Sequence, residues 1–227
     1  MSGKITIKEI IMVDSRIQKL AKGLINYSIN LQKGEKVLIE AKGVDYMLIN
    51  ELVKEAFKVG AYPFVSMFDN RVSRELLMGE TEEYAKLKAK YDTYKMADMD
   101  AYIAIRGGNN SNETSDVPVR NMQIESEFYS RPVHHELRVK KTKWVVLRYP
   151  NPGMAQSAGM STDAFEDFYF TVCNLDYSKM DEAMNSLKAR LDRADKVRII
   201  AKDTDLSFSI KFKLNSTLQP PQNTSSI

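Results

Sequence analysis

Apolar residues recur along the chain in two alternating patterns. Residues three or four apart mark the apolar face of a helix, and short unbroken apolar runs mark buried strands. The helical pattern covers residues 12–30, the segment between Asp45 and Gly60, and residues 72–95, 117–130, 163–173 and 179–194. The strand pattern covers Val37–Ile39, Tyr62–Met67, Ala101–Ile105, Trp144–Leu147, Val197–Ala201 and Leu206–Ile210. This alternation predicts an α/β fold with a mostly parallel sheet flanked by helices.

Local signals at the helix ends agree with this pattern. Asp45 is placed to cap the helix that follows it, and Gly60 stands where a left-handed helix stop is expected. Asp163 and Glu166 have the spacing of a capping box. The helix over residues 179–194 is expected to direct its apolar stripe inward. This stripe comprises Met180, Met184, Leu187 and Leu191.

The pattern changes near the C-terminus. The last two strands are separated by Asp203-Thr204-Asp205, which predicts a C-terminal hairpin. After Ile210 the periodicity is lost and polar residues dominate, which predicts a disordered tail. The expected organisation is an N-terminal α/β domain over residues 1–195, a terminal hairpin or the start of a following domain over 196–211, and the disordered tail over 212–227.

Composition and charge narrow the class of protein. The 227 residues are 43% hydrophobic and 28% charged, close to the averages for soluble globular proteins. No apolar run approaches the roughly 20 residues that cross a bilayer, and the N-terminus lacks the pattern of an export signal. A net charge of +3 is too balanced to argue for nucleic acid. We therefore expect a cytoplasmic protein with neither a membrane nor a nucleic acid as partner.

The residue types that carry nucleophilic or metal chemistry form no recognisable site. His134 and His135 are interpreted as neighbours on an extended segment, where they point to opposite faces and cannot grip one metal ion. No HExxH motif is present, and Cys173 is the only cysteine. Cys173 lies on the apolar stripe of its helix and is expected to be buried. The sequence therefore assigns no catalytic residue and no metal ligand.

Two polar segments have plain structural interpretations. Gly107-Gly108-Asn109-Asn110 follows a strand, where α/β proteins often bind ligands, but it lacks the spacing of a dinucleotide or P-loop motif. It is interpreted as a flexible loop. The basic run Arg138, Lys140, Lys141 and Lys143 has no motif of stacking aromatic residues and is interpreted as a charged loop before a buried strand.

The strongest motif of the chain is KWVVLRYPNPGMAQSAGMSTDAFEDFYFTVC, from Lys143 to Cys173. Its informative positions are Trp144, Pro150, Met154, Ala155, Ala158, Met160, Phe165, Asp167 and Phe168. In these positions the chain resembles the metallo-aminopeptidases of the aminopeptidase T and aminopeptidase S type. Leu20–Ala41, Val53–Val65 and Thr204–Ile210 add to the resemblance, which covers about residues 15–210.

This resemblance implies an N-terminal α/β domain followed by a larger C-terminal domain, usually in a homodimer. It also implies a pair of zinc, cobalt or manganese ions, which hold a peptide and generate the hydroxide that releases its N-terminal residue. The family's ligands are glutamates, histidines, a tyrosine and an aspartate of the C-terminal half, and none has a matching position here. We therefore expect this chain to hold the non-catalytic domain, to bind no cofactor itself and to be inactive alone.

The alternative is a stand-alone α/β module that binds a small ligand or a protein. In either case the segment 151–160 follows the strand Trp144–Leu147, at the edge of the sheet where open α/β folds place ligand-facing loops. Its polar residues Asn151, Gln156 and Ser157 are the candidates for contact with a substrate or with the catalytic domain. A peptide substrate is expected only when that domain is present. The apolar surface that it would cover predicts self-association.

Overall fold

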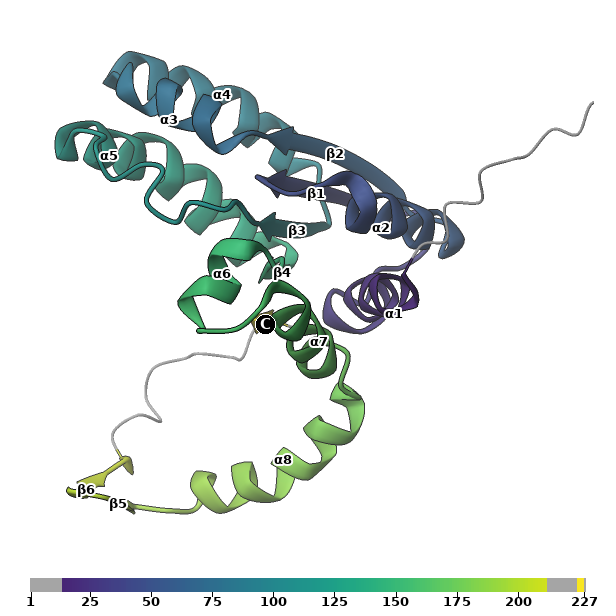
Figure 1. The fold of residues 1–227 in the computed structure, drawn as a ribbon, viewed down its shortest axis with the longest axis vertical. Helices are drawn as coiled ribbons and strands as arrows, with labels where there is room; N and C mark the ends of the chain where they lie inside the picture. Colours follow the sequence, from purple (N-terminus) through teal and green to yellow (C-terminus); the bar gives the residue numbers. More distant parts are fainter. Residues whose placement is uncertain (1–13, 212–223, 227) are drawn as a thin grey trace, which may run out of the picture. The chain divides into compact units, whose positions relative to one another are not determined.

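The computed structural model describes residues 14–211 and 224–226. Two compact units make up the chain: Met1–Asn174 with Asn223–Ile227, and Leu175–Gln222. Figure 1 labels their helices and strands. The three domains expected from the sequence stay a prediction. Within residues 14–211 no helix is both long and apolar enough to cross a bilayer.

The first unit is built on a parallel sheet. Its strands are β1 (Lys36–Lys42), β2 (Tyr62–Phe68), β3 (Ala101–Arg106), β4 (Lys143–Arg148) and β7 (Thr224–Ser226). They lie in the order β2-β1-β3-β4-β7, and every neighbouring pair is parallel. The prediction of a mostly parallel sheet is confirmed. Of the tail predicted over 212–227, all but β7 lies outside the described residues.

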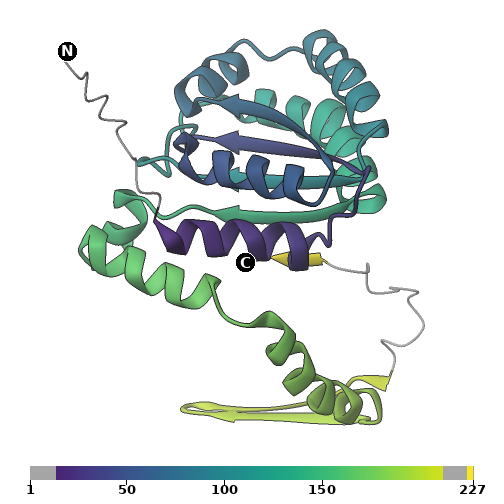
Figure 2. The same cartoon turned by 90° about the vertical axis from the view of Figure 1, so that its right-hand side faces the viewer.

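Helices cover both faces of this sheet, as Figure 2 shows. They are α1 (Ser15–Gly23) with its π-helical continuation η1 (Leu24–Ser28), α2 (Tyr46–Lys58), α3 (Asn70–Met78), α4 (Glu82–Ala97), α5 (Val119–Glu125) with its π-helical continuation η2 (Ser126–Val139), α6 (Pro152–Ser157) and α7 (Thr162–Cys173). Helices α1, α2 and α7 share a core with one face of the sheet, and α4 and η2 share a core with the other. The predicted flanking layers are therefore present.

Alternating strand residues supply the two cores. Ile39 and Ile103 belong to the core shared with α1, α2 and α7, whereas Leu38 and Tyr102 belong to the core shared with α4 and η2. All four side chains are at most 1% exposed. Burial of each large apolar side chain stabilises the fold by about 1.5–3 kcal/mol. The sheet is therefore held by burial on both faces, as expected of parallel strands.

The helix ends confirm some local signals and correct others. Asp45 caps α2 by accepting from the Tyr46 backbone N–H at 2.6 Å, and Gly60 has the positive φ of +78° predicted for a helix stop. The single helix predicted over 72–95 is wrong, because α3 and α4 are separate helices. Thr81 starts the second of them as its N-cap.

The segment predicted to leave helix near residue 130 instead continues through η2 to Val139. Pro132 lies inside this helix, where it removes a backbone donor. Val133 and Arg138 are buried just beyond it. Packing on the sheet therefore extends the helix past a residue that ordinarily ends one.

This extension corrects two interpretations of the sequence. His134 and His135 lie on η2, not on an extended segment, and their ring centres are 5.2 Å apart. Arg138 is not part of a solvated loop, since it lies on the same helix with 5% of its surface exposed. The basic run therefore begins in the core of the molecule.

The segment predicted as a loop over residues 151–160 contains the short helix α6, so that prediction is also wrong. The next helix, α7, is capped by Ser161, which accepts a hydrogen bond from the Ala164 backbone N–H. The predicted capping box of Asp163 and Glu166 is therefore not what starts this helix. Cys173, at its end, is buried as predicted.

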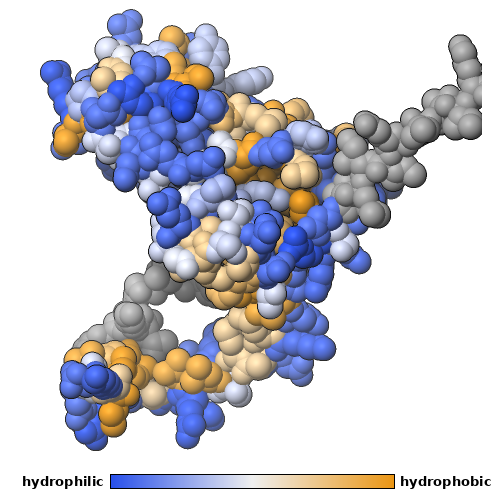
Figure 3. Space-filling model, viewed as in Figure 1, coloured by the Kyte–Doolittle hydropathy of each residue, from blue (hydrophilic) through white to orange (hydrophobic). Residues whose placement is uncertain are grey.

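The described part of the second unit contains α8 (Tyr177–Asp192) and the strands β5 (Lys196–Ala201) and β6 (Thr204–Ser209). The strands pair antiparallel, which confirms the predicted hairpin. The prediction that α8 turns its apolar stripe inward is wrong. Its residues are 40–57% exposed: Met180, Met184, Leu187 and Leu191. Figure 3 shows apolar surface over α8 and the hairpin.

Candidate functional site

The carboxyl edge of the parallel sheet is the candidate site of the first unit. In Figure 2 the arrows of the parallel sheet point to this edge, and the connections after β1, β2, β3 and β4 start there. The chain leaves β1 toward α2 on one face of the sheet and leaves β3 toward α5 and η2 on the other. Open α/β sheets bind ligands where neighbouring connections diverge in this way. The position between β1 and β3 is therefore the candidate place for a ligand in the first unit.

Glycines bring the loops after β1 and β3 into close contact at this point. A Cβ atom on Gly43 would lie 2.5 Å from Asn70 Nδ2, and one on Gly108 would lie 2.0 Å from the same atom. Asn70 Nδ2 donates a hydrogen bond to the Gly107 carbonyl at 3.0 Å. Both Gly43 and Gly108 also have positive φ, which glycine adopts readily. The loop interpreted as flexible is therefore fixed at its start by backbone packing.

The three candidate contact residues lie on or beside α6, next to this loop. A Cβ atom on Gly153 would lie 2.4 Å from the Asn109 carbonyl oxygen, so α6 and the loop after β3 touch. Asn151 caps α6 by accepting from a backbone N–H at 3.0 Å, and Ser157 donates to the Gly153 carbonyl at 2.9 Å. Gln156 is exposed. Contact of these residues with a substrate or a domain stays a prediction.

Three basic residues occupy the last positions of the three central strands. Lys42 of β1 pairs in register with Arg106 of β3, which pairs with Arg148 of β4. Residues in register on parallel strands point to the same face, and here the alternation places them on the face covered by α4 and η2. Neighbouring strands are about 4.8 Å apart, so the three positions extend over about 10 Å. We call Lys42, Arg106 and Arg148 the basic row.

The basic row has no direct counter-charge within the part of the chain that the structure describes. None of its three side chains forms an ion pair or a hydrogen bond with a described residue. Arg106 and Arg148 are exposed, and Lys42 is partly buried. Burial and the neighbouring charge of Arg106 lower the pKa of the Lys42 ammonium. Positive charge therefore accumulates at this edge.

Two titratable groups on the covering helices interact with the basic row. Glu125 of α5 interacts with Lys42, but burial raises the pKa of the Glu125 carboxyl above its ordinary value. His134 of η2 interacts with Arg106, and burial together with nearby positive charge lowers the pKa of its imidazole. His134 is therefore neutral at pH 7, where a neutral imidazole can both donate and accept a hydrogen bond.

A polar network lies deeper on the same face of the sheet. Glu40 accepts hydrogen bonds from the Tyr102 hydroxyl at 2.9 Å and from Arg138 Nη2 at 2.7 Å. The Arg138 guanidinium also lies 4.6 Å from the centre of the Tyr102 ring. Glu40 forms no hydrogen bond or ion pair with the basic row, but its charge favours the charged form of the Lys42 ammonium. This network joins η2 to the sheet and has a structural role.

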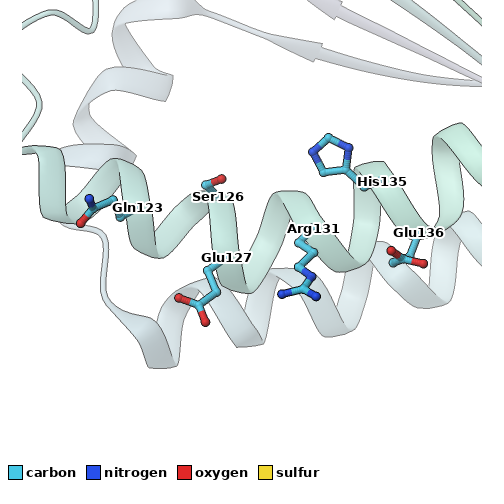
Figure 4. A pocket seen from close by; sticks show the side chains of 6 residues that line it. All are labelled: Gln123, Ser126, Glu127, Arg131, His135 and Glu136. Atoms are coloured by element: carbon cyan, nitrogen blue, oxygen red, sulfur yellow. The ribbon is translucent and has the colours of Figure 1, made fainter.

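A shallow pocket of about 670 Å³ lies along α5 and η2 (Figure 4). Its lining residues are Gln123, Ser126, Glu127, Arg131, His135 and Glu136. The side chains point to both sides of the helix, with His135 and Glu127 on opposite sides, and do not converge on one point. Glu136 is bonded to Lys140. The arrangement indicates a groove on a solvated helix and no chemistry.

The donor set in residues 14–211 does not fit the two-metal site that the resemblance implies. No group of three or more histidine, cysteine, aspartate or glutamate side chains among these residues could hold a metal ion. His134 and His135 lie side by side without a third ligand of these kinds. No reaction step can therefore be assigned to a metal in this part of the chain.

Sequence reasoning missed the basic row and the Glu40 network. A usable signal was present, because an apolar run ends in a basic residue at Arg106 and at Arg148, and Lys42 follows the apolar run Val37–Ile39 after two residues. Parallel strands end at the same edge of a sheet, so these residues could have been grouped once the strands were predicted. The network offers no such signal, since Glu40 and Arg138 are 98 positions apart.

Comparison with known proteins agrees with this fold. The model of a family described as thermophilic metalloprotease (M29) matches residues 13–215, so the chain belongs to the M29 peptidase family. The resemblance found in the sequence is thereby confirmed. A solved structure, wild-type AmpT from Thermus thermophilus, has a similar fold, with a TM-score of 0.65 and 18% identity over 86% of this chain and 53% of its own. This chain thus spans about half the length of that relative. No curated protein matches.

Proposed function

We propose that this chain acts as the non-catalytic N-terminal part of a metal-dependent aminopeptidase. The observation that carries the proposal is the family match over residues 13–215, combined with a fold that corresponds to about half of AmpT. The lack of a suitable ligand group among residues 14–211 agrees with it. The zinc, cobalt or manganese pair implied by the resemblance is then held by residues of the C-terminal half of such an enzyme.

In this role the first unit shapes the entrance to the active site. The carboxyl edge of the sheet, with α6 and its residues Asn151, Gln156 and Ser157, is the surface that we assign to this entrance. A peptide binds productively only when the catalytic part is present. The enzyme works as a homodimer, as the resemblance implies for its family, and it is cytoplasmic, as the single cysteine and the lack of an export pattern indicate.

Metal analysis and a peptidase assay on the purified chain test the proposal. We expect less than stoichiometric zinc, cobalt or manganese and no release of amino acids from peptide amides, with or without added metal. A variant carrying His134→Ala and His135→Ala controls for metal held loosely by the histidine pair. Stoichiometric metal with turnover that survives repurification would contradict the proposal.

A second candidate function is a stand-alone module that binds a small ligand. The observation that favours it is the basic row, which presents three cations without ion-pair partners among the described residues. The two functions differ in a measurable way. A module binds its ligand without further protein, whereas the non-catalytic part of an aminopeptidase needs the catalytic part before a peptide is processed.

A further inference from the structure

We propose that the basic row binds a small ligand that carries two adjacent oxyanions, such as a diphosphate or a short dicarboxylate. The site lies at the carboxyl ends of β1, β3 and β4 and consists of Lys42, Arg106 and Arg148. This inference goes beyond the proposed aminopeptidase role, since it requires neither a metal ion nor a catalytic domain.

The spacing of the basic row determines the shape of the ligand. Consecutive positions lie one strand spacing apart, about 4.8 Å, and the two end positions about 10 Å apart. Lys42 and Arg106 are neighbours in register and can share one oxyanion, and Arg106 and Arg148 can share a second. Guanidinium groups bind both carboxylate and phosphate oxygens through paired N–H donors. A ligand with two anionic groups therefore engages all three residues.

The charge balance around the basic row favours an anion. Some arginines of the described chain are bonded to carboxylates, such as Arg74 to Asp116, whereas others, such as Arg71 and Arg120, form no ion pair with a described residue. In the basic row like charges are adjacent, and the pKa of the Lys42 ammonium is lowered by burial and by Arg106. A bound anion relieves this repulsion. It therefore binds more strongly than at an isolated surface cation.

The nearby acidic groups do not remove this preference. Glu40 is bonded to Arg138 and Tyr102. Glu125 interacts with Lys42, yet burial raises the pKa of its carboxyl and so disfavours its charged form. His134 is neutral at pH 7 and interacts with Arg106, so its imidazole adds no charge and can donate to an anion.

The position of the basic row favours a small ligand over an acidic protein surface. Lys42 is partly buried between the diverging connections of β1 and β3, where the packed loops at Gly43 and Gly107 fix the backbone. A small anion reaches such a recessed ammonium, whereas a flat protein surface reaches the exposed Arg106 and Arg148 only. The site also lies at the switch point at which open α/β sheets bind small molecules.

Isothermal titration calorimetry on the full chain, in low salt at pH 7, tests the proposal. The probes are inorganic pyrophosphate, succinate and polyglutamate. We expect binding of pyrophosphate or succinate in the micromolar to low millimolar range. Binding of pyrophosphate alone identifies a phosphate ligand, and binding of succinate alone identifies a carboxylate ligand. Binding of polyglutamate without either small anion would overturn the proposal in favour of an acidic protein partner.

Charge-neutralising variants locate the site. Arg106→Gln removes the central cation and is expected to weaken binding at least tenfold, and Arg148→Gln, a second exposed position, several-fold. Arg190→Gln removes an equal charge from exposed α8 and is expected to leave the affinity within twofold. Circular dichroism confirms the fold of each variant. Equal weakening by Arg106→Gln and Arg190→Gln, or no binding of either small anion below 10 mM, would overturn the proposal.

Discussion

Helices α2 and α8 carry the same kind of apolar stripe, but the stripe of α2 is buried and the stripe of α8 is exposed. Leu48 and Leu52 of α2 are at most 2% exposed, because α2 packs on α1 and the sheet. Met184 and Leu187 of α8 are 50% and 57% exposed. Up to Lys211, the second unit has only a two-stranded hairpin beside α8, and a hairpin cannot cover such a stripe as a sheet does. An amphipathic pattern thus predicts an apolar face, but not its burial within the described chain.

Ion pairs of the two units also differ in burial. The side chains of Arg138 and Glu40 are 7% and 20% exposed in the first unit. Those of Arg198 and Asp205 are 60% and 56% exposed in the hairpin. Removing one partner of a buried pair leaves an uncompensated charge in the core, whereas an exposed charge returns to water. The comparison between the units can therefore be tested by matched substitutions.

The largest expected effect is the loss of the buried pair. Arg138→Gln is expected to lower the free energy of unfolding of the first unit by about 3–5 kcal/mol, because Glu40 keeps its charge without a cation. Arg198→Gln, in the exposed pair, is expected to change the free energy of unfolding far less, because water already solvates both side chains. Urea unfolding followed by fluorescence of Trp144, the single tryptophan, and by circular dichroism measures both. Equal losses would contradict the comparison.

Truncation of apolar side chains gives the next largest effect. Leu52→Ala leaves a cavity at a position that is 0% exposed, so we expect the free energy of unfolding to fall by about 2–5 kcal/mol. Leu187→Ala makes the same change at a position that is 57% exposed, and we expect a change within about 0.5 kcal/mol. The same urea experiment measures both variants. A large loss for Leu187→Ala would show that α8 is covered in solution.

Exposure of the α8 stripe is expected to cause self-association. Light scattering should give a mass above 25.9 kDa that rises with concentration. Met184→Lys places a charge on the stripe and is expected to shift the mass toward that of the monomer. Ala189→Lys adds the same charge on the opposite side of α8 and is expected to have no effect. A mass of one chain at every concentration would refute the prediction.

The smallest expected effect is a pH dependence from His134. Burial, together with the charges of Arg138, His135 and Arg106, lowers the pKa of its imidazole in the folded chain. The unfolded chain therefore binds this proton more readily, and its histidine titrates near pH 6.5. Stability is expected to fall as the pH decreases from about 6.5 through the folded pKa. Urea midpoints between pH 5 and 7.5 measure this slope.

Two variants separate the contribution of His134 to the pH dependence of stability from contributions with the opposite sign. Burial raises the pKa of Glu125, so the stability from this carboxyl decreases as the pH rises from about 4.5 through its folded pKa. His134→Asn is expected to flatten the loss on the acidic side, whereas His135→Asn removes only one of the charges that lower the His134 pKa and should preserve most of the loss. An unchanged slope in His134→Asn would assign the effect to another group.

Much of the fold of the first unit could be predicted, whereas the basic row was missed although the strand ends carried a signal for it. The central strand of the sheet, β3, is an apolar run, and α2 begins after Asp45 and ends before Gly60 as predicted. These features depend on near neighbours in the chain. The motif residues 151–160 were also placed at the correct edge of the sheet, although α6 was missed. The candidate contact residues there remain untested.

The sequence by itself determined the order of helices and strands, the parallel sheet and the family, because periodicity and motifs are local properties of the chain. Only the tertiary structure decided that η2 continues through Pro132, that Arg138 is buried against Glu40, and that α8 leaves its stripe exposed. It also brought the basic row into register. Each of these outcomes depends on the surface that a distant segment supplies, and a local pattern holds no information about that surface.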